Sequence, residues 1–535
     1  MRRIALPTIA AALGLALLPL QPTSAAEMPD QAWSEGTIEA IGPGTYESAS
    51  KSFIIPETDV SAGLMGRSHR VVGQVQGVSQ PQDAPTNRSD LGVFGPSWEA
   101  EFLGGQVNRK LTPGSGSITT TDLDAKESTR YDLTDSVAGP NGGGVNTYTA
   151  ADGSNLVETV KWDDLAGVLK TTVVETLNID LTTSVEGDDV PVDALGNPIP
   201  AADLKPSFTY KQVGGGGDNW RVTATGNAAY KLTTVSYDSV GRVSTVNLPA
   251  SPETPAESIK VNYATTTTAS GGTLGDVTGR VKDITRTSGE TVETLARYSY
   301  DGSGLLRKVT NPNAGADLST YTYDTNERLA TVATPAYAWD LNYVGDAAAP
   351  DAVQTVGTTP DPNDPIDPPS APGSVTAADA PGHCDHAMRW IWLQYRDCWA
   401  KEVAHYGWRS PTWKRLPNGR MILGITYDHC TSAPDQPAGY DFRPSCDAHD
   451  YTYGVIGNWY KKEPENMSPD KKWTSDAEFH SLLKNQTCPR YRMRSFCNVT
   501  AAIYYNAVRW GGNPKNGANK TRNPIIDQVS RPAER

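Results

Sequence analysis

A proline-rich stretch, TTPDPNDPIDPPSAPGSVTAADAPG (358–382), divides this chain into two parts. It contains seven prolines and few side chains that could pack into a core. This composition favours an extended backbone and is typical of a linker. At 535 residues the chain is also too long for one ordinary domain. The stretch therefore predicts a multidomain protein, with a front part at 27–357 and a back part at 383–512.

The two parts differ in composition. All six cysteines, eight of the thirteen tryptophans and six of the seven histidines follow residue 380. The front part is strongly acidic, whereas the back part carries a net positive charge. We therefore expect two separately folded regions with different chemistry. The last residues, 513–535, are polar and are predicted to form a loose tail.

The N-terminus predicts export. Arg2 and Arg3 precede an apolar run from Ile4 to Leu20, and small residues follow at 24–26. This pattern is typical of a secretory signal peptide, which we place at 1–26. A membrane anchor is the alternative, but prolines and polar residues interrupt the run. No later segment is apolar enough to cross a membrane, so a secreted protein without a transmembrane segment in its mature chain is expected.

The front part contains repeated segments: VSYDSVGRVSTVNLP (235–249), YSYDGSGLLRKVTNP (298–312) and YTYDTNERLATVATP (321–335). In each, alternating side chains flank an Asp-containing turn, which predicts one β-hairpin per unit. These segments resemble the YD repeats of the RHS family, and GVFGPSWEAEF (92–102) resembles the segment that often precedes them. The resemblance implies a β-rich region that often lies upstream of a C-terminal effector domain. An ordinary secreted β-rich domain is the alternative.

In the back part, the segment CDAHDYTYG (446–454) predicts a helix with polar groups on one face. Cys446, His449, Asp450 and Tyr453 are spaced so that they share that face, and Pro444 fits the start of a helix. A stripe with histidine and aspartate is not a normal core stripe, although a surface His-Asp pair is common. The helix is therefore a candidate catalytic element.

The preceding loop predicts a cation site. Asp428 and Cys430 come before a loop rich in proline and glycine, and Cys446 opens the helix. A disulfide between Cys430 and Cys446 would bring Asp428 close to Asp450. Two carboxylates and loop carbonyls are the oxygen ligands that Ca²⁺ prefers.

These residues resemble the prokaryotic and fungal secreted phospholipase A2 family, and the resemblance continues through 475–488 and 497–512. It implies a small all-α, disulfide-bonded domain with two long antiparallel helices. It implies His449 as general base and Asp476 as the carboxylate that orients it, with Asp470 as the alternative. For Tyr453, a hydrogen bond to that carboxylate and simple packing both remain open. The implied Ca²⁺ ligands are Asp428, the His429 carbonyl and Asp450.

The resemblance also favours two disulfides, Cys430–Cys446 and Cys488–Cys497. Cys384 and Cys398 remain as a third pair, because free thiols are less common in exported proteins. The stretch HAMRWIWLQYRDCWAKEV (386–403) predicts an amphipathic helix whose tryptophans either pack in the core, the favoured interpretation, or contact a membrane surface.

The expected function is that of a secreted, calcium-dependent phospholipase A2. It would hydrolyse the sn-2 ester of glycerophospholipids in membranes or vesicles, through peripheral contact, as the effector domain of an RHS-type protein. No nucleic-acid-binding motif is present, and no Ser-based nucleophile motif was found. The alternative is a surface-binding interaction protein whose phospholipase-like module is catalytically silent.

Overall fold

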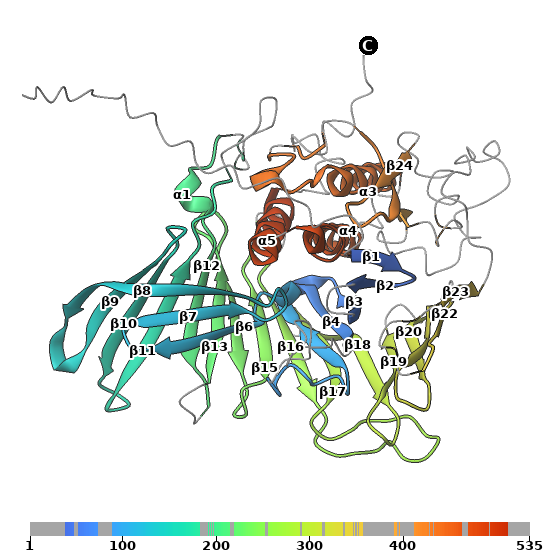
Figure 1. Cartoon of the computed structure of the whole chain (residues 1–535), viewed down its shortest axis with the longest axis horizontal. Helices are drawn as coiled ribbons and strands as arrows, with labels where there is room; N and C mark the ends of the chain where they lie inside the picture. The colour runs from blue at the N-terminus through green and yellow to red at the C-terminus, as the bar shows by residue number, and fades with distance from the viewer. Residues whose placement is uncertain are drawn as a thin grey trace, which may run out of the picture.

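The computed structural model (Figure 1) describes two folded regions. The residues described are 38–47, 52–72, 88–181, 191, 193, 195, 197–214, 219–251, 255–288, 291–312, 316–334, 338–345, 347, 350, 352–356, 390–392, 395, 398, 411–426, 429–431, 433–462, 469–491 and 493–511. The predicted signal peptide (1–26), linker (358–382) and tail (513–535) lie outside these residues.

The front part is built from two antiparallel sheets, which confirms a large β-rich region. The smaller sheet has the order β1-β2-β3-β4-β5, with strands Ile38–Ile41, Gly44–Glu47, Ser52–Val60, Met65–Val72 and Trp98–Glu101. In the larger sheet, β6 to β23, the strands pair with their chain neighbours (Figure 1). The short helix α1 (Ala201–Leu204) lies between β11 and β12.

The strands of the larger sheet are β6 Arg109–Gly114, β7 Ser117–Asp122, β8 Glu127–Ala138, β9 Gly144–Ala150, β10 Asn155–Asp163, β11 Val168–Thr176, β12 Ser207–Gln212, β13 Trp220–Gly226, β14 Thr233–Tyr237, β15 Val243–Leu248, β16 Glu257–Tyr263, β17 Val281–Ser288, β18 Thr291–Tyr300, β19 Leu306–Asn311, β20 Ala316–Tyr323, β21 Leu329–Ala333, β22 Ala338–Asn342 and β23 Ala352–Val356.

The three repeated segments form the predicted hairpins, β14–β15, β18–β19 and β20–β21. Their Tyr-Asp pairs explain the repeat. The aspartate caps the turn: Asp301 Oδ1 accepts hydrogen bonds from the backbone N–H groups of Ser303 and Leu305. The tyrosine hydroxyl joins neighbouring strands, as when Tyr300 donates to the carbonyl of Val281 at 2.8 Å. Each unit thus supplies its own turn and its own link to the preceding strand.

The back part is helical. It contains α3 (Arg443–Lys462), α4 (Pro469–Ser481), a π-helical segment (Leu482–Thr487), a 3-10 turn (Cys488–Arg490) and α5 (Arg494–Gly511). Contacts near the start of α3 reach the middle of α4, and contacts near the end of α3 reach the start of α4. The α3 and α4 helices are therefore antiparallel, as predicted.

The expectation of an all-α domain is wrong in one detail, because strands β24 (Thr412–Arg415) and β25 (Met421–Gly424) form a hairpin. The Asn418-Gly419 turn, with φ of +90° at Gly419, is a strong hairpin signal that our sequence reasoning missed. Ile422 and Leu423 are fully buried in a cluster with residues of α3. The hairpin therefore supports the helix that carries the candidate histidine.

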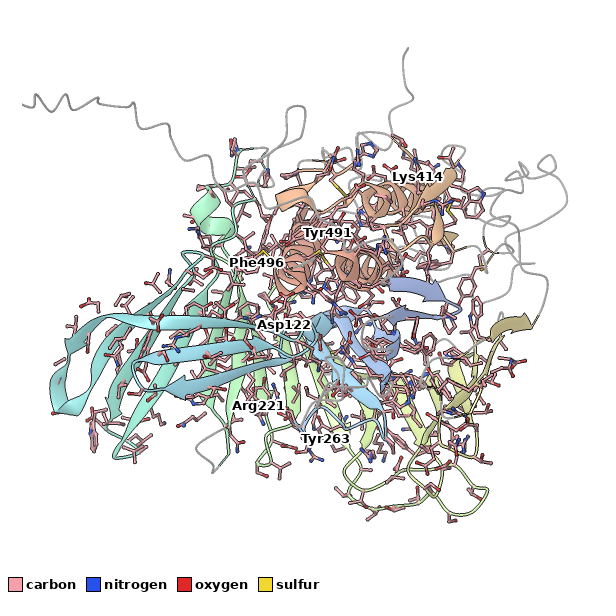
Figure 2. The ribbon with its side chains drawn as sticks, in the orientation of Figure 1. Asp122, Arg221, Tyr263, Lys414, Tyr491 and Phe496 are labelled. Carbon is pink, nitrogen blue, oxygen red and sulfur yellow. A yellow bond between two sulfur atoms is a disulfide. The ribbon has the colours of Figure 1, made fainter. Side chains whose placement is uncertain are left out.

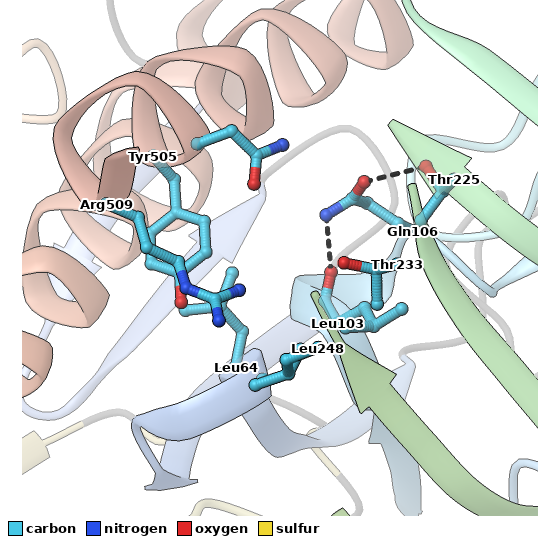
Figure 3. A pocket seen from close by; sticks show the side chains of 10 residues that line it. Leu64, Leu103, Gln106, Thr225, Thr233, Leu248, Tyr505 and Arg509 are labelled. Carbon is cyan, nitrogen blue, oxygen red and sulfur yellow. Dashed lines mark hydrogen bonds between the residues drawn. The ribbon is translucent and has the colours of Figure 1, made fainter. Parts of the chain in front are cut away.

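The two parts share a hydrophobic core. Trp473 of α4 and Val499 and Ile503 of α5 belong to the same buried cluster as the apolar side chains of the sheets. Figure 1 shows α4 and α5 lying over β1–β4 and the adjoining strands of the larger sheet. A small cavity of about 10 Å³, lined by Leu64, Leu103, Tyr505 and Arg509 among others, remains where the two parts meet (Figure 3). It has room for about one water molecule.

Charged groups reinforce this contact. Lys484 Nζ, in the π-helical segment, donates to Glu101 Oε2 at 3.0 Å and to Asp124 Oδ2 at 2.8 Å. Glu127 accepts hydrogen bonds from the first backbone N–H groups of α5, at 2.7 and 2.9 Å. Asp122, labelled beside Phe496 in Figure 2, accepts one from Ser495 Oγ. Carboxylates of the sheet region thus bind a lysine, a serine hydroxyl and the first backbone N–H groups of α5.

One further prediction concerns residues 386–403, and another concerns membrane-spanning helices. Of the predicted helix 386–403, the structure describes four of its aromatic, aliphatic and cysteine positions as buried: Trp390, Ile391, Tyr395 and Cys398. For Trp390 the core interpretation is confirmed. Trp392 is half-buried and forms a β-bridge with Ile422, so the predicted helix is wrong at this residue. None of the helices within the described residues combines the length and the apolar composition needed to cross a membrane.

Candidate active site

The predicted polar stripe lies on α3 and faces the interior. Cys446, His449, Asp450 and Tyr453 are all buried. The opposite side of the helix places Ala448, Tyr451 and Val455 in a separate apolar cluster. The helix therefore buries two faces, one apolar and one carrying titratable groups.

The histidine and the predicted carboxylate are in contact. His449 Nε2 lies 3.0 Å from Asp476 Oδ1, and Tyr453 donates its hydroxyl to the same oxygen. The phenyl ring of Phe479 lies 4.7 Å from the imidazole, centroid to centroid. Of the two interpretations left open for Tyr453, the structure shows the hydrogen bond to the carboxylate of Asp476. Asp470, the alternative to Asp476, has no described side chain.

This arrangement sets the protonation states of the pair. Burial lowers the pKa of His449, and the hydrogen bond and charge of Asp476 oppose that effect only in part. Burial would raise the pKa of Asp476, but the charge of Lys472 and the contact with His449 outweigh it and lower the pKa. A neutral imidazole beside an ionised carboxylate is the combination that a general base needs, with Nε2 donating to the carboxylate and Nδ1 left for a reactant.

Our sequence reasoning missed Lys472. Its ammonium lies 2.6 Å from Asp476 Oδ2, one helical turn along α4, and its side chain is buried. In the sequence, PDKKWTSD resembles an ordinary solvated helix start, so no local signal distinguishes this lysine from Lys471. Only the packing of α5 over it makes it part of the site.

A disulfide fastens the candidate cation loop to α3. Cys430 and Cys446 are bonded, with their Cα atoms 5.1 Å apart, and Cys488 is bonded to Cys497. Both predicted pairings are confirmed. Cys398 is disulfide-bonded, and Cys384 lies outside the described residues.

Within this loop, His429 has a left-handed backbone with φ of +57°. Its carbonyl accepts a hydrogen bond from the Thr431 N–H at 3.2 Å, which leaves one lone pair. Its side chain is also engaged, because Nδ1 lies 2.8 Å from Asp447 Oδ1, and Lys414 pairs with the other Asp447 oxygen. The side chain therefore helps to hold the loop, a role that the sequence did not indicate.

The described residues of the candidate site offer the kind of oxygen ligand that calcium binds. The His429 carbonyl and the buried Asp450 carboxylate are hard oxygen ligands, and the disulfide joins their two elements. Asp428, the third predicted ligand, lies outside the described residues. No group of three or more His, Cys, Asp and Glu suited to a metal occurs within the described part of the chain.

Comparison with known proteins agrees with this geometry. Residues 409–512 match the family model described as prokaryotic phospholipase A2. A secretory phospholipase A2 of Arthroderma benhamiae is 36% identical over 95 residues, which is 16% of this chain and 57% of that protein. A secretory phospholipase A2 of Beauveria bassiana is 30% identical over 90 residues, 17% of this chain and 44% of that protein.

The chain thus spans about half the length of the curated relatives that it matches. The family model covers His449, Asp450, Tyr453, Asp476 and both disulfides of the helical region. The helical region at 409–512 is therefore similar to phospholipase A2 domains, and the sheet region lies outside the match.

Proposed function

We propose that this protein is a secreted, calcium-dependent phospholipase A2 that hydrolyses the sn-2 ester of glycerophospholipids. The observation that carries the proposal is the buried contact between His449 and Asp476, inside a segment that matches a phospholipase A2 family model. The YD-repeat-like region would act as the carrier of this effector domain, with peripheral contact to membranes or vesicles.

In the proposed mechanism His449 is the general base. Its Nδ1 removes a proton from water as the water attacks the ester carbonyl, and Nε2–H donates to Asp476 throughout. Asp476 holds the imidazole in the tautomer that leaves Nδ1 free for this step, and it stabilises the imidazolium that forms. The imidazolium then returns the proton to the leaving alcohol. Tyr453 restricts rotation of the carboxylate.

Asp428, the His429 carbonyl and Asp450 would hold the calcium ion. When bound, the ion would supply the positive charge that stabilises an ester oxyanion. The Cys430–Cys446 disulfide and the His429–Asp447 contact would keep these oxygens on one side of His449.

The test uses the purified full chain on vesicles of a phospholipid with different acyl chains at sn-1 and sn-2. We expect release of the sn-2 fatty acid with calcium, and none with chelator or in His449→Ala. Release of the sn-1 chain would contradict the positional assignment. Vesicle binding without any release would favour the catalytically silent alternative. Tyr210→Phe, in the sheet region, is the matched control and should retain full activity.

A further inference from the structure

Lys472 is the buried cation of the site that the mechanism above does not use. Within the described residues its ammonium has three acceptors: Asp476 Oδ2 at 2.6 Å, the Val508 carbonyl at 3.1 Å and the Arg509 carbonyl at 3.3 Å. These acceptors match its three N–H donors. The lysine thus connects the candidate catalytic carboxylate to the last turns of α5.

We propose that Lys472 is a positioning residue for the hydrolytic reaction, and that it acts by fixing the orientation of the Asp476 carboxylate. The inference depends on the proposed function. With Oδ2 held by Lys472, Oδ1 points at His449 Nε2 and the Tyr453 hydroxyl. The carboxylate then has no freedom to rotate away from the imidazole.

Geometry and charge both support this role. A buried charge-assisted hydrogen bond of this length is strong and directional. The positive charge also keeps Asp476 ionised despite its complete burial, because it lowers the pKa of that carboxyl. Without the lysine, the carboxylate would keep only its partners on the imidazole side, and its second oxygen would lose its charged donor.

A purely structural role is the competing explanation, since Lys472 also satisfies carbonyls at the C-terminal end of α5. The two roles differ in what they affect. A structural lysine changes stability and lowers activity without regard to Asp476. A positioning lysine changes kcat through Asp476 alone.

Kinetics of the full chain separate them. For Lys472→Met we expect kcat to fall about 10- to 100-fold with KM nearly unchanged, as is usual when an outer partner of a catalytic group is removed. Lys472→Gln keeps an N–H donor, so its kcat should fall less than that of Lys472→Met. If the Met variant does not fold, the Gln variant provides the test. Lys471→Met is the matched control. Lys471 lies on α4 beside Lys472, but its ammonium contacts the Trp459 ring on α3, 3.6 Å from the centroid, so its loss should leave kcat unchanged.

A double-variant cycle gives the decisive comparison. If Lys472 acts through Asp476, then adding Lys472→Met or Lys472→Gln to Asp476→Asn should produce no further loss of kcat. Losses that multiply, or a kcat of Lys472→Met equal to that of the wild type, would overturn the proposal.

A second readout does not depend on activity. The Nε2 proton of His449, assigned by its absence in His449→Ala, should give a protected downfield NMR signal in ¹⁵N-histidine-labelled protein. We expect this signal to shift or exchange rapidly in Lys472→Met and Lys472→Gln and to persist in Lys471→Met. If the wild type hydrolyses no phospholipid but the signal responds in this way, the proposed function fails and the positioning role stands. An unchanged signal in a folded variant rejects the positioning role.

Discussion

Two buried carboxylates, one in each part of the chain, have similar surroundings and different capabilities. Glu175 of β11 accepts hydrogen bonds from Arg109, Tyr210, Tyr131 and Thr120. Asp476 of α4 is approached by Lys472, Tyr453 and His449. In both sites charge and hydrogen bonds outweigh burial, and the pKa of the carboxyl is lowered.

The difference lies in one partner. Every donor to Glu175 keeps its proton at neutral pH, because burial and the nearby carboxylate raise the pKa of Tyr131 and Tyr210 far above their usual value. The partner of Asp476 is an imidazole with a second nitrogen that can take a proton. A buried carboxylate therefore supports a fold when all its partners are fixed donors, and it supports chemistry when one partner can exchange protons.

Replacing the imidazole tests this comparison most strongly. For His449→Ala we expect hydrolysis to fall by about 10²- to 10⁴-fold, the usual contribution of a general base, since the variant lacks the imidazole nitrogen that accepts the proton. The folded state should survive, because Asp476 keeps its bond to Lys472. Fatty-acid release and circular dichroism of the full chain measure the two effects, and activity within twofold of the wild type would remove His449 from the mechanism.

The same chemical change at the two carboxylates should have opposite consequences. Asp476→Asn should lower kcat by about 10²- to 10⁴-fold because the imidazole loses its orienting charge. Glu175→Gln should leave kcat unchanged but lower the free energy of unfolding by about 3–5 kcal/mol, because it leaves the Arg109 guanidinium buried without its counter-charge. Kinetics and urea unfolding of both variants check this, and a loss of activity in folded Glu175→Gln would contradict it.

The interface carboxylate Asp124 adds a pH test. Lys484 and Arg70 outweigh burial and lower its pKa to about 2, against an ordinary value of 3.8. Its contribution to stability is therefore present above the ordinary pKa and is lost as the pH falls from about 4 towards 2. We expect Asp124→Asn to unfold at lower denaturant concentration than the wild type at pH 6, and the difference to shrink in this acid range. An equal difference at pH 2 and pH 6 would show that Asp124 is not the linked group.

Removing one tyrosine hydroxyl from each cluster should have the smallest effects. Tyr210→Phe should lower the free energy of unfolding by about 1–3 kcal/mol, because Glu175 and Arg109 each lose a buried partner. Tyr453→Phe removes one donor from Asp476 and should reduce kcat by less than Asp476→Asn, with little change in KM. If Tyr453→Phe changed KM alone, the tyrosine would contact substrate and not the carboxylate.

Local patterns predicted the elements that carry the candidate site. The spacing of Cys446, His449, Asp450 and Tyr453 predicted one helical face, because the helical period is a local property of the backbone. The repeated Tyr-Asp segments predicted hairpins for the same reason, since their turn bonds join residues within four positions. The contact between His449 and Asp476 was predicted only through the family resemblance.

The structure, not the local pattern, revealed the partners that come from distant parts of the chain. Lys484 and Glu101 are 383 positions apart, and no local feature of either indicates a buried ion pair. The same holds for Lys472, whose acceptors on α5 lie 36 and 37 positions away. The excised segment 381–535 would therefore expose Trp473, Val499 and Ile503, which the sheets cover in the full chain.

The sequence alone predicted the helix that carries His449, the three repeat hairpins and the residues that share a helical face. It also showed an acidic front part and a basic back part. The pairing of buried charges and the core shared by the two regions became visible in the folded structure. The physical reason is the range of the interactions. Periodicity, capping and turn chemistry act over a few residues, whereas burial and electrostatic pairing depend on which elements pack against each other after the chain has folded.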